Sequence, residues 1–209
     1  MKEGIHMKKI SALLLALLMI LSLSACGQAK EAAPAAVGGW TGPEKAEVTE
    51  DAQAAFDKAL EGLTGVSYTP VALVGTQLVS GTNYCILCEA RVVYPDAVPY
   101  YALVYVYADL NGGAELLDIV ILDIGDIAET GEIKPAEAAP AALMGGWSVD
   151  RESSVEVDGA QLHLASQVVN GTKHCVLCQG AKLAFVYESL DGKTELTSTV
   201  SLDPGALRG

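Results

Sequence analysis

Apolar residues recur every three or four positions between residues 47 and 63, and this spacing predicts an amphipathic helix. Thr49 precedes Glu50 and Asp51, so it is suited to cap the amino end, where the helix dipole favours acidic side chains. Gly62 and Gly65 end the pattern. The expected apolar stripe consists of Ala52, Ala55, Phe56, Ala59, Leu60 and Leu63.

After residue 65 the pattern changes to strand-like runs rich in Val, Ile, Tyr and Leu, with turn residues between them. The predicted strands are 66–79, 82–94, 98–108 and 114–123. Ser80-Gly81, Pro95-Asp96 and Asn111-Gly112-Gly113 separate them, and these are typical of hairpin turns. One helix followed by an antiparallel meander predicts an α+β module in which the sheet wraps around the helix.

Three blocks of this sequence occur twice in the same order, which indicates a duplicated unit. The pairs are 31–40 with 137–147, 77–88 with 167–178, and 108–116 with 188–196. The stretch from Trp147 to Gln167 lacks the residues that form the helix in the first copy, so the second copy is predicted to be helix-less and mostly β. Without the helix, one face of its sheet needs another surface to pack against. We expect it to pack on the first module, to pair sheet edges with it, or to dimerise.

Composition marks the boundaries between these units. Residues 26–37 and 125–144 are rich in Ala, Pro and Glu and carry no apolar periodicity, which is typical of tethers and linkers. We therefore expect a tether at 26–37, module one at 38–124, a linker at 125–144 and a truncated module two at 145–209.

The amino-terminal residues 1–25 have the pattern of a secretory signal peptide. Lys8 and Lys9 precede an apolar run that ends in Leu-Ser-Ala-Cys26, and Met7 is a plausible true start. The ending resembles the bacterial lipobox, whose cysteine is acylated and becomes the new amino terminus. The alternative is ordinary cleavage beside an incidental cysteine. We expect a lipoprotein anchored through Cys26 on the outer, extracytoplasmic face of the bacterial cell membrane.

Acidic residues outnumber basic ones, 26 to 13, for a formal net charge of −13. Nucleic acids need a basic protein face, so this balance argues against a nucleic-acid partner and against lipid binding beyond the anchor. The sequence contains no Ser/His/Asp arrangement, P-loop, Rossmann glycine pattern or His-x-x-x-His. We therefore expect neither enzyme activity nor a cofactor.

Four features together resemble the cystatin family, the inhibitors of papain-like cysteine peptidases. They are a Gly pair near the start of the module, one long helix, the motif Gln77-Leu78-Val79-Ser80-Gly81 followed by Thr-Asn-Tyr, and a second hairpin before the last strand. The family motif is Gln-Val-Val-Ala-Gly, and residues 167–171 differ from it only at Asn170. The resemblance covers module one and the part of module two after the missing helix. It implies a cystatin-like antiparallel sheet wrapped on one helix, plus a second cystatin-like repeat without the helix.

In cystatins a glycine trunk and two hairpins form a wedge that binds the peptidase. Glycine allows the trunk backbone to approach a cleft closely, and a rigid hairpin lowers the ordering cost of binding. The resemblance implies that the module-one wedge consists of Gly38, Gly39, Gln77, Leu78, Val79, Ser80, Gly81, Leu110, Asn111 and Gly112. The equivalents in the second repeat are Gly145, Gly146, Gln167, Val168, Val169, Asn170 and Gly171.

This sequence departs from the family in its second hairpin. Cystatins usually carry Pro, often Pro-Trp, there, whereas Leu110-Asn111-Gly112 and Leu190-Asp191-Gly192 have neither. An aromatic anchor of the kind that dominates binding energy is therefore missing. Trp40 either compensates for it or packs on the sheet.

Two other functions stay open. The same scaffold could be a non-inhibitory module that recognises another surface protein or a peptide, for example by strand addition at an open edge. A thiol or zinc protein is the third alternative, through Cys85, Cys88, Cys175 and Cys178. These cysteines lie mid-strand, where residues three apart face opposite ways about 10 Å apart, too far for a disulfide without a bulge. Reduced thiols, disulfides and metal binding remain alternatives, and we interpret His163 and His174 as packing or surface residues rather than ligands.

Overall fold

The computed structural model describes residues 38–136, 138–140 and 142–208, and these residues belong to one compact unit. They form two antiparallel sheets of five strands each, with three short α-helices. The predicted signal peptide at 1–25, Cys26 and the tether at 26–37 lie outside the described residues. No helix in the described part of the chain is long and apolar enough to cross a membrane.

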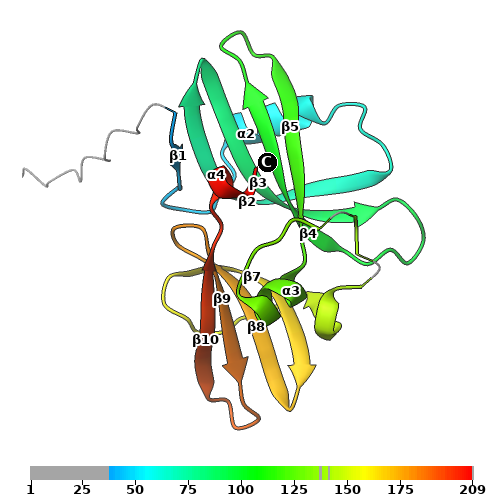
Figure 1. Ribbon diagram of the computed structural model, residues 1–209, viewed down its shortest axis with the longest axis vertical. Helices are drawn as coiled ribbons and strands as arrows, with labels where there is room; N and C mark the ends of the chain where they lie inside the picture. The colour runs from blue at the N-terminus through cyan, green and yellow to red at the C-terminus, as the bar shows by residue number, and fades with distance from the viewer. Residues whose placement is uncertain (1–37, 137, 141, 209) are drawn as a thin grey trace, which may run out of the picture. The chain divides into compact units, whose positions relative to one another are not determined.

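The first sheet is the meander expected from the sequence, and its strands lie side by side in chain order (Figure 1). Its strands are β1 (Trp40–Thr41), β2 (Val66–Val79), β3 (Gly81–Val92), β4 (Tyr100–Ala108) and β5 (Ala114–Leu122). The four long strands confirm the predicted ranges, with small shifts at their ends. The described chain is mostly antiparallel sheet with few helices, which is compatible with the predicted α+β class.

Helix α2 (Glu50–Ala59) covers one face of this sheet. Thr49 caps it as predicted, because its side-chain oxygen accepts a hydrogen bond from the Ala52 backbone N–H at 3.2 Å. Ala52, Ala55 and Phe56 are buried, and they pack in one cluster with apolar side chains of β2, β3 and β4. The helix is shorter than the predicted range 47–63, because Thr49 caps its amino end and it ends at Ala59, ahead of Gly62, whose φ angle is positive.

The second sheet repeats this strand order without the helix. Its strands are β6 (Ser148–Val149), β7 (Ala160–Val169), β8 (Gly171–Cys178), β9 (Lys182–Glu188) and β10 (Thr194–Ser201). The first hairpins close identically, with Val79 opposite Gly81 and Val169 opposite Gly171. A short helix, α4 (Pro204–Leu207), follows β10.

The two sheets share one hydrophobic core, so the second sheet packs on the first, which is one of the three covers expected from the sequence. Leu103 and Tyr105 contribute from the first sheet, and Leu164 and Phe185 from the second. The Tyr101 hydroxyl donates a hydrogen bond to the Leu164 carbonyl oxygen at 2.8 Å. The buried side of module one therefore depends on module two.

The range 125–144, expected to be an unstructured linker, contains most of helix α3 (Ile124–Thr130) and the start of a 3-10 turn, η1 (Met144–Gly146). Ile124, Ile127 and Leu143 are buried in the shared core. The Asp123 carboxylate caps α3 by accepting from the Gly125 N–H at 2.9 Å. A helix this short cannot display a periodic apolar stripe, which is why the sequence pattern did not indicate it.

Candidate functional site

The two hairpin turns of module one lie at the same end of the first sheet (Figure 1). Thr82 pairs with Ala108 where β3 begins and β4 ends, so the β2–β3 turn and the β4–β5 turn are neighbours. The Tyr107 hydroxyl donates a hydrogen bond to the Ser80 carbonyl oxygen and ties the two turns together. We call Gly38, Gly39, residues 77–81 and residues 110–112 the module-one edge.

The glycine trunk is attached to the first hairpin by a glutamine of the motif. The Gln77 side-chain Nε2 donates to the Gly38 carbonyl oxygen at 2.8 Å, and the Gly38 N–H donates to the Leu78 carbonyl oxygen at 3.1 Å. Asn83 fixes the same glutamine, because its Nδ2 donates to Gln77 Oε1 at 2.7 Å. All three elements predicted from the resemblance therefore meet at one end of the sheet. Sequence analysis missed Asn83, although its place directly after the motif was a signal.

Gly81 is required by the geometry of the first turn. Its φ angle is +128°, and a Cβ atom there would lie 2.3 Å from the Ala108 carbonyl oxygen. The second turn is stabilised differently. The Asp109 carboxylate accepts from the N–H groups of Gly113 at 2.8 Å and Asn111 at 2.7 Å, and these bonds lower the pKa of Asp109. Lys58 of α2 also donates to the Gly112 carbonyl oxygen at 2.5 Å.

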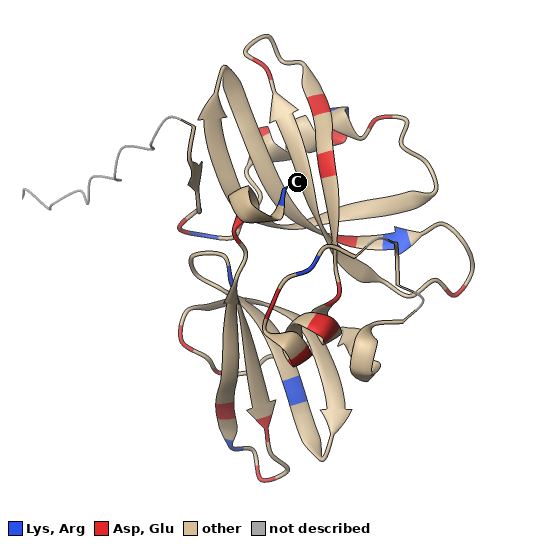
Figure 2. Ribbon diagram, viewed as in Figure 1, with Lys and Arg blue, Asp and Glu red and all other residues tan. Residues whose placement is uncertain are grey.

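Apolar side chains project into solvent from both turns of the module-one edge. Leu78 and Val79 are exposed on the first hairpin, and Leu110 is 82 % exposed on the second. Exposed apolar side chains gathered on a rigid edge are typical of a contact surface. Figure 2 shows that acidic residues outnumber basic ones along the described chain, whereas residues 77–81 carry no charge.

Module two repeats this geometry, and we call Gly145, Gly146, residues 167–171 and residues 190–192 the module-two edge. Gln167 Nε2 donates to the Gly145 carbonyl oxygen, and the Tyr187 hydroxyl donates to the Asn170 carbonyl oxygen. Gly171 has a φ angle of +116°. Val168 and Leu190 are each 84 % exposed. The same edge geometry is therefore present in module two, which has no helix between β6 and β7.

One contact differs between the two edges. Gln77 Oε1 accepts from Asn83, whereas Gln167 Oε1 is buried without a hydrogen-bond partner. Lys173 occupies the place of Asn83, since each lies opposite the glutamine in the strand register. The trunk of module two is therefore held by an incompletely satisfied side chain.

The tryptophans that follow the glycine pairs pack inward. The ring of Trp40 lies edge-on to Tyr105 with centroids 5.7 Å apart, and Trp147 lies edge-on to Phe185 at 5.9 Å. Trp40 therefore packs on the sheet, which is the second of the two roles considered for it. The exposed apolar contacts of the edge come from leucine and valine instead.

The four cysteines of the sheets are unpaired and buried. Cys85 and Cys175 face the shared core, Cys88 faces α2, and Cys178 faces the helix-less side of the second sheet. Burial raises the pKa of the Cys85 thiol to about 12 and also raises the pKa of the other three. In the described ranges no group of three or more His, Cys, Asp or Glu side chains could hold a metal ion.

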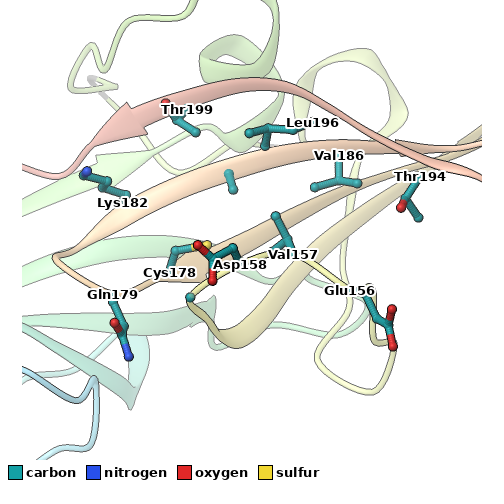
Figure 3. Close-up of a pocket in the computed structure, with 12 residues that line it drawn as sticks. Glu156, Val157, Asp158, Cys178, Gln179, Lys182, Val186, Thr194, Leu196 and Thr199 are labelled. Carbon is teal, nitrogen blue, oxygen red and sulfur yellow. The ribbon is translucent and has the colours of Figure 1, made fainter.

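A groove of about 570 Å³ lies on the helix-less face of the second sheet (Figure 3). Val157 and Cys178 line one side, and Val186, Leu196 and Thr199 of β9 and β10 line the other. Val155 and Val157 pack on Val176, Cys178 and Ala184, so the segment before β7 covers part of this face. The remainder is open.

Comparisons with protein-family models, with curated proteins and with solved structures find no match to this chain, so a candidate function rests on the sequence motifs and on the geometry of the two edges.

Proposed function

We propose that this protein is a surface-anchored, cystatin-like inhibitor whose module-one edge enters the cleft of papain-like cysteine peptidases. The observation that carries the proposal is the meeting of trunk, first hairpin and second hairpin at one end of the sheet. Gln77 holds the trunk and Tyr107 joins the hairpins, so the edge is preorganised.

The strand order supports a cystatin-like fold for module one. One helix packed on an antiparallel sheet whose four long strands follow in chain order is what the resemblance implies. The second sheet has the same order without the helix, which supports a truncated cystatin-like repeat. The module-two edge would then act as a second, similar contact surface.

Inhibition of this kind is binding alone, so no catalytic residue or cofactor takes part. Leu110 stands in the second hairpin, where the family usually carries Pro-Trp, and supplies a smaller apolar contact. Smaller anchors contribute less binding energy, so we expect weaker inhibition than an aromatic anchor would give. The proposed location is the outer face of the bacterial membrane, through acylation of Cys26.

The test is papain inhibition by the full chain in detergent. We expect inhibition at nanomolar to micromolar concentration. Gly39→Arg should raise the inhibition constant at least about a hundredfold, because a long side chain blocks close approach of the trunk. Ser154→Arg adds the same charge at an exposed site away from both edges and should change nothing.

Gly146→Arg separates the two edges, because it alters only the trunk of module two. Unchanged papain inhibition by this variant assigns the inhibition to module one. Absence of inhibition by the unaltered chain at about 100 µM would reject the inhibitor function.

One observation favours the alternative of a peptide-binding module. Strand β10 forms one edge of the second sheet and pairs only with β9 among the described strands, and Leu196 on it is exposed beside the groove. An extended segment of another surface protein could add to this edge. A second copy pairing there would give the dimer expected from the sequence. Sedimentation equilibrium of the full chain distinguishes a dimer from a monomer.

A further inference from the structure

A chain of hydrogen bonds crosses the helix-less face of the second sheet. His163 Nδ1 lies 2.5 Å from the Asp150 carbonyl oxygen, and His163 Nε2 lies 3.0 Å from His174 Nδ1. His174 Nε2 lies 3.2 Å from the Glu188 carboxylate. Both imidazoles are nearly inaccessible, with His163 6 % and His174 4 % exposed.

Comparison with module one shows which residues the histidine network replaces. His163 lies opposite Val176 in the register as Leu73 lies opposite Ile86, so His163 corresponds to Leu73. By the same alignment His174 corresponds to Tyr84, and both module-one residues pack in the cluster beneath α2. Module two therefore has a polar network where module one has the contact surface of its helix.

The two imidazoles bind each other directly. Their centroids are 5.2 Å apart and their planes are inclined by 72°. For nitrogens 3.0 Å apart this separation is close to the largest that the rings allow, so the two nitrogens point at each other. Such an arrangement suits one shared hydrogen bond and leaves no room for a metal ion between the rings.

Counting protons fixes the charge state in which this network is complete. The Asp150 carbonyl oxygen can only accept, so His163 Nδ1 carries a proton, and an ionised Glu188 likewise requires a proton on His174 Nε2. The bond between the rings needs a third proton. Two neutral imidazoles carry only two, so the network is complete with one additional proton, formally an imidazolium at His174 paired with Glu188.

Two carboxylates and two cationic side chains surround the pair. Asp150 is anionic, since burial raises its pKa but hydrogen bonds from Ser153, Ser166 and the Glu152 N–H together hold it at about 2. Glu188 is the second carboxylate. Arg151 lines the same pocket as His163, and Lys173 is exposed next to His174 on β8. β7 carries no titratable residue other than His163.

We propose that His163, His174 and Glu188 form a proton-dependent clasp that joins β7, β8 and β9 in place of the missing helix. The clasp lies directly behind the module-two edge, because His174 follows Gly171 closely and Glu188 precedes Leu190. Loss of the proton breaks one hydrogen bond of the clasp and loosens this edge. The module-one edge, which α2 supports, keeps its structure.

The pH dependence follows from proton linkage. The folded clasp holds one proton that the unfolded chain releases at alkaline pH, so the second sheet loses stability as the pH rises from about 6.5 to 8.5. Below about pH 6.5 the two histidines of the unfolded chain together bind more than one extra proton, whereas the folded pair holds one, because two imidazolium rings cannot lie 3.0 Å apart without strong repulsion. The contribution of the clasp to the stability of the second sheet therefore peaks near about pH 6.5.

Hydrogen exchange of the full chain measures this directly, with rates corrected for the intrinsic effect of pH. We expect the protection of the β7, β8 and β9 amides to fall about tenfold between pH 6.5 and 8.5. The variant His163→Leu/His174→Tyr/Glu188→Ala installs the module-one residues. It should remove the pH dependence, and an equal dependence in this variant would overturn the clasp.

Nitrogen-15 NMR of the imidazoles gives a second, independent reading at pH 6.5. We expect one N–H on His163 and two on His174, and two neutral rings would overturn the proposal. If the triple variant does not fold, Glu188→Gln replaces it. Loss of the carboxylate should move the drop in protection to lower pH, and an unmoved drop contradicts the clasp. These measurements need no peptidase, so their outcome is independent of whether the protein inhibits one.

Discussion

At the scale of single residues, the two edges differ in how completely their hydrogen bonds are satisfied. Gln77 uses both ends of its amide, one toward Gly38 and one toward Asn83. Gln167 makes the first bond only, and its oxygen is buried without a partner. An unsatisfied buried acceptor costs free energy, so the second trunk is held less firmly than the first.

The substitution Lys173→Asn should correct this defect. The introduced amide would donate to Gln167 Oε1 as Asn83 donates to Gln77, and we expect the free energy of unfolding to rise by about 0.5–1.5 kcal/mol. Urea denaturation measures it. The reciprocal control, Asn83→Lys, removes a satisfied bond and should lower the free energy of unfolding by a similar amount. If Asn83→Lys raised the free energy of unfolding, the hydrogen bond between the two side-chain amides would make no net contribution to stability.

At the scale of elements, helix α2 accounts for the main difference between the modules. In module one its apolar face covers Leu73, Ile86 and Val104. In module two a short segment and the histidine network share this role, and a groove remains. Burial on this face should therefore differ between equivalent residues of the two modules.

Phe56→Ala tests the contribution of the helix to module one. Phe56 is buried against the sheet, and removing a buried aromatic ring leaves a cavity, so we expect a loss of about 3–5 kcal/mol in the free energy of unfolding. Thermal and urea unfolding measure it. Leu63→Ala, at an exposed position past the helix end, should change stability by less than about 0.5 kcal/mol. Equal effects of both variants would contradict the packing of α2.

Thiol alkylation compares the two equivalent faces directly. Cys178 lines the groove, whereas Cys88 lies under α2, and burial raises the pKa of both thiols. We expect iodoacetamide to modify Cys178 faster than Cys88, Cys85 and Cys175, with rates that increase with pH because the thiolate is the reactive form. Peptide mapping by mass spectrometry identifies the sites. Faster reaction at Cys88 would mean that α2 does not shield it.

At the scale of the whole described unit, the shared core couples the two sheets. Buried side chains from both sheets form one cluster, and Tyr101 donates across it to the Leu164 carbonyl oxygen. Separating the two sheets would expose apolar surface on both. We therefore expect one cooperative unfolding transition rather than two.

Leu164→Ala tests this coupling. Leu164 belongs to module two and its side chain is fully buried, so we expect the truncation to lower the free energy of unfolding by about 2–5 kcal/mol. Hydrogen-exchange protection should fall in β3 and β4 of module one as well as in β7 and β8. Leu190→Ala, at a site 84 % exposed, should leave both sheets unchanged. Loss of protection confined to module two would show that the modules unfold independently.

The sequence by itself determined the helix, the strands and the duplication, because local periodicity and turn residues encode elements that form between near neighbours in the chain. It also indicated which residues belong to each edge. Only the tertiary structure decided that Gln77 holds the trunk, that the range 125–144 contains a helix packed in the core, and that His163 and His174 meet on the uncovered face. The glutamine and histidine contacts join residues from different strands, and the helix in 125–144 is too short to show a periodic stripe, so no local pattern could reveal these features.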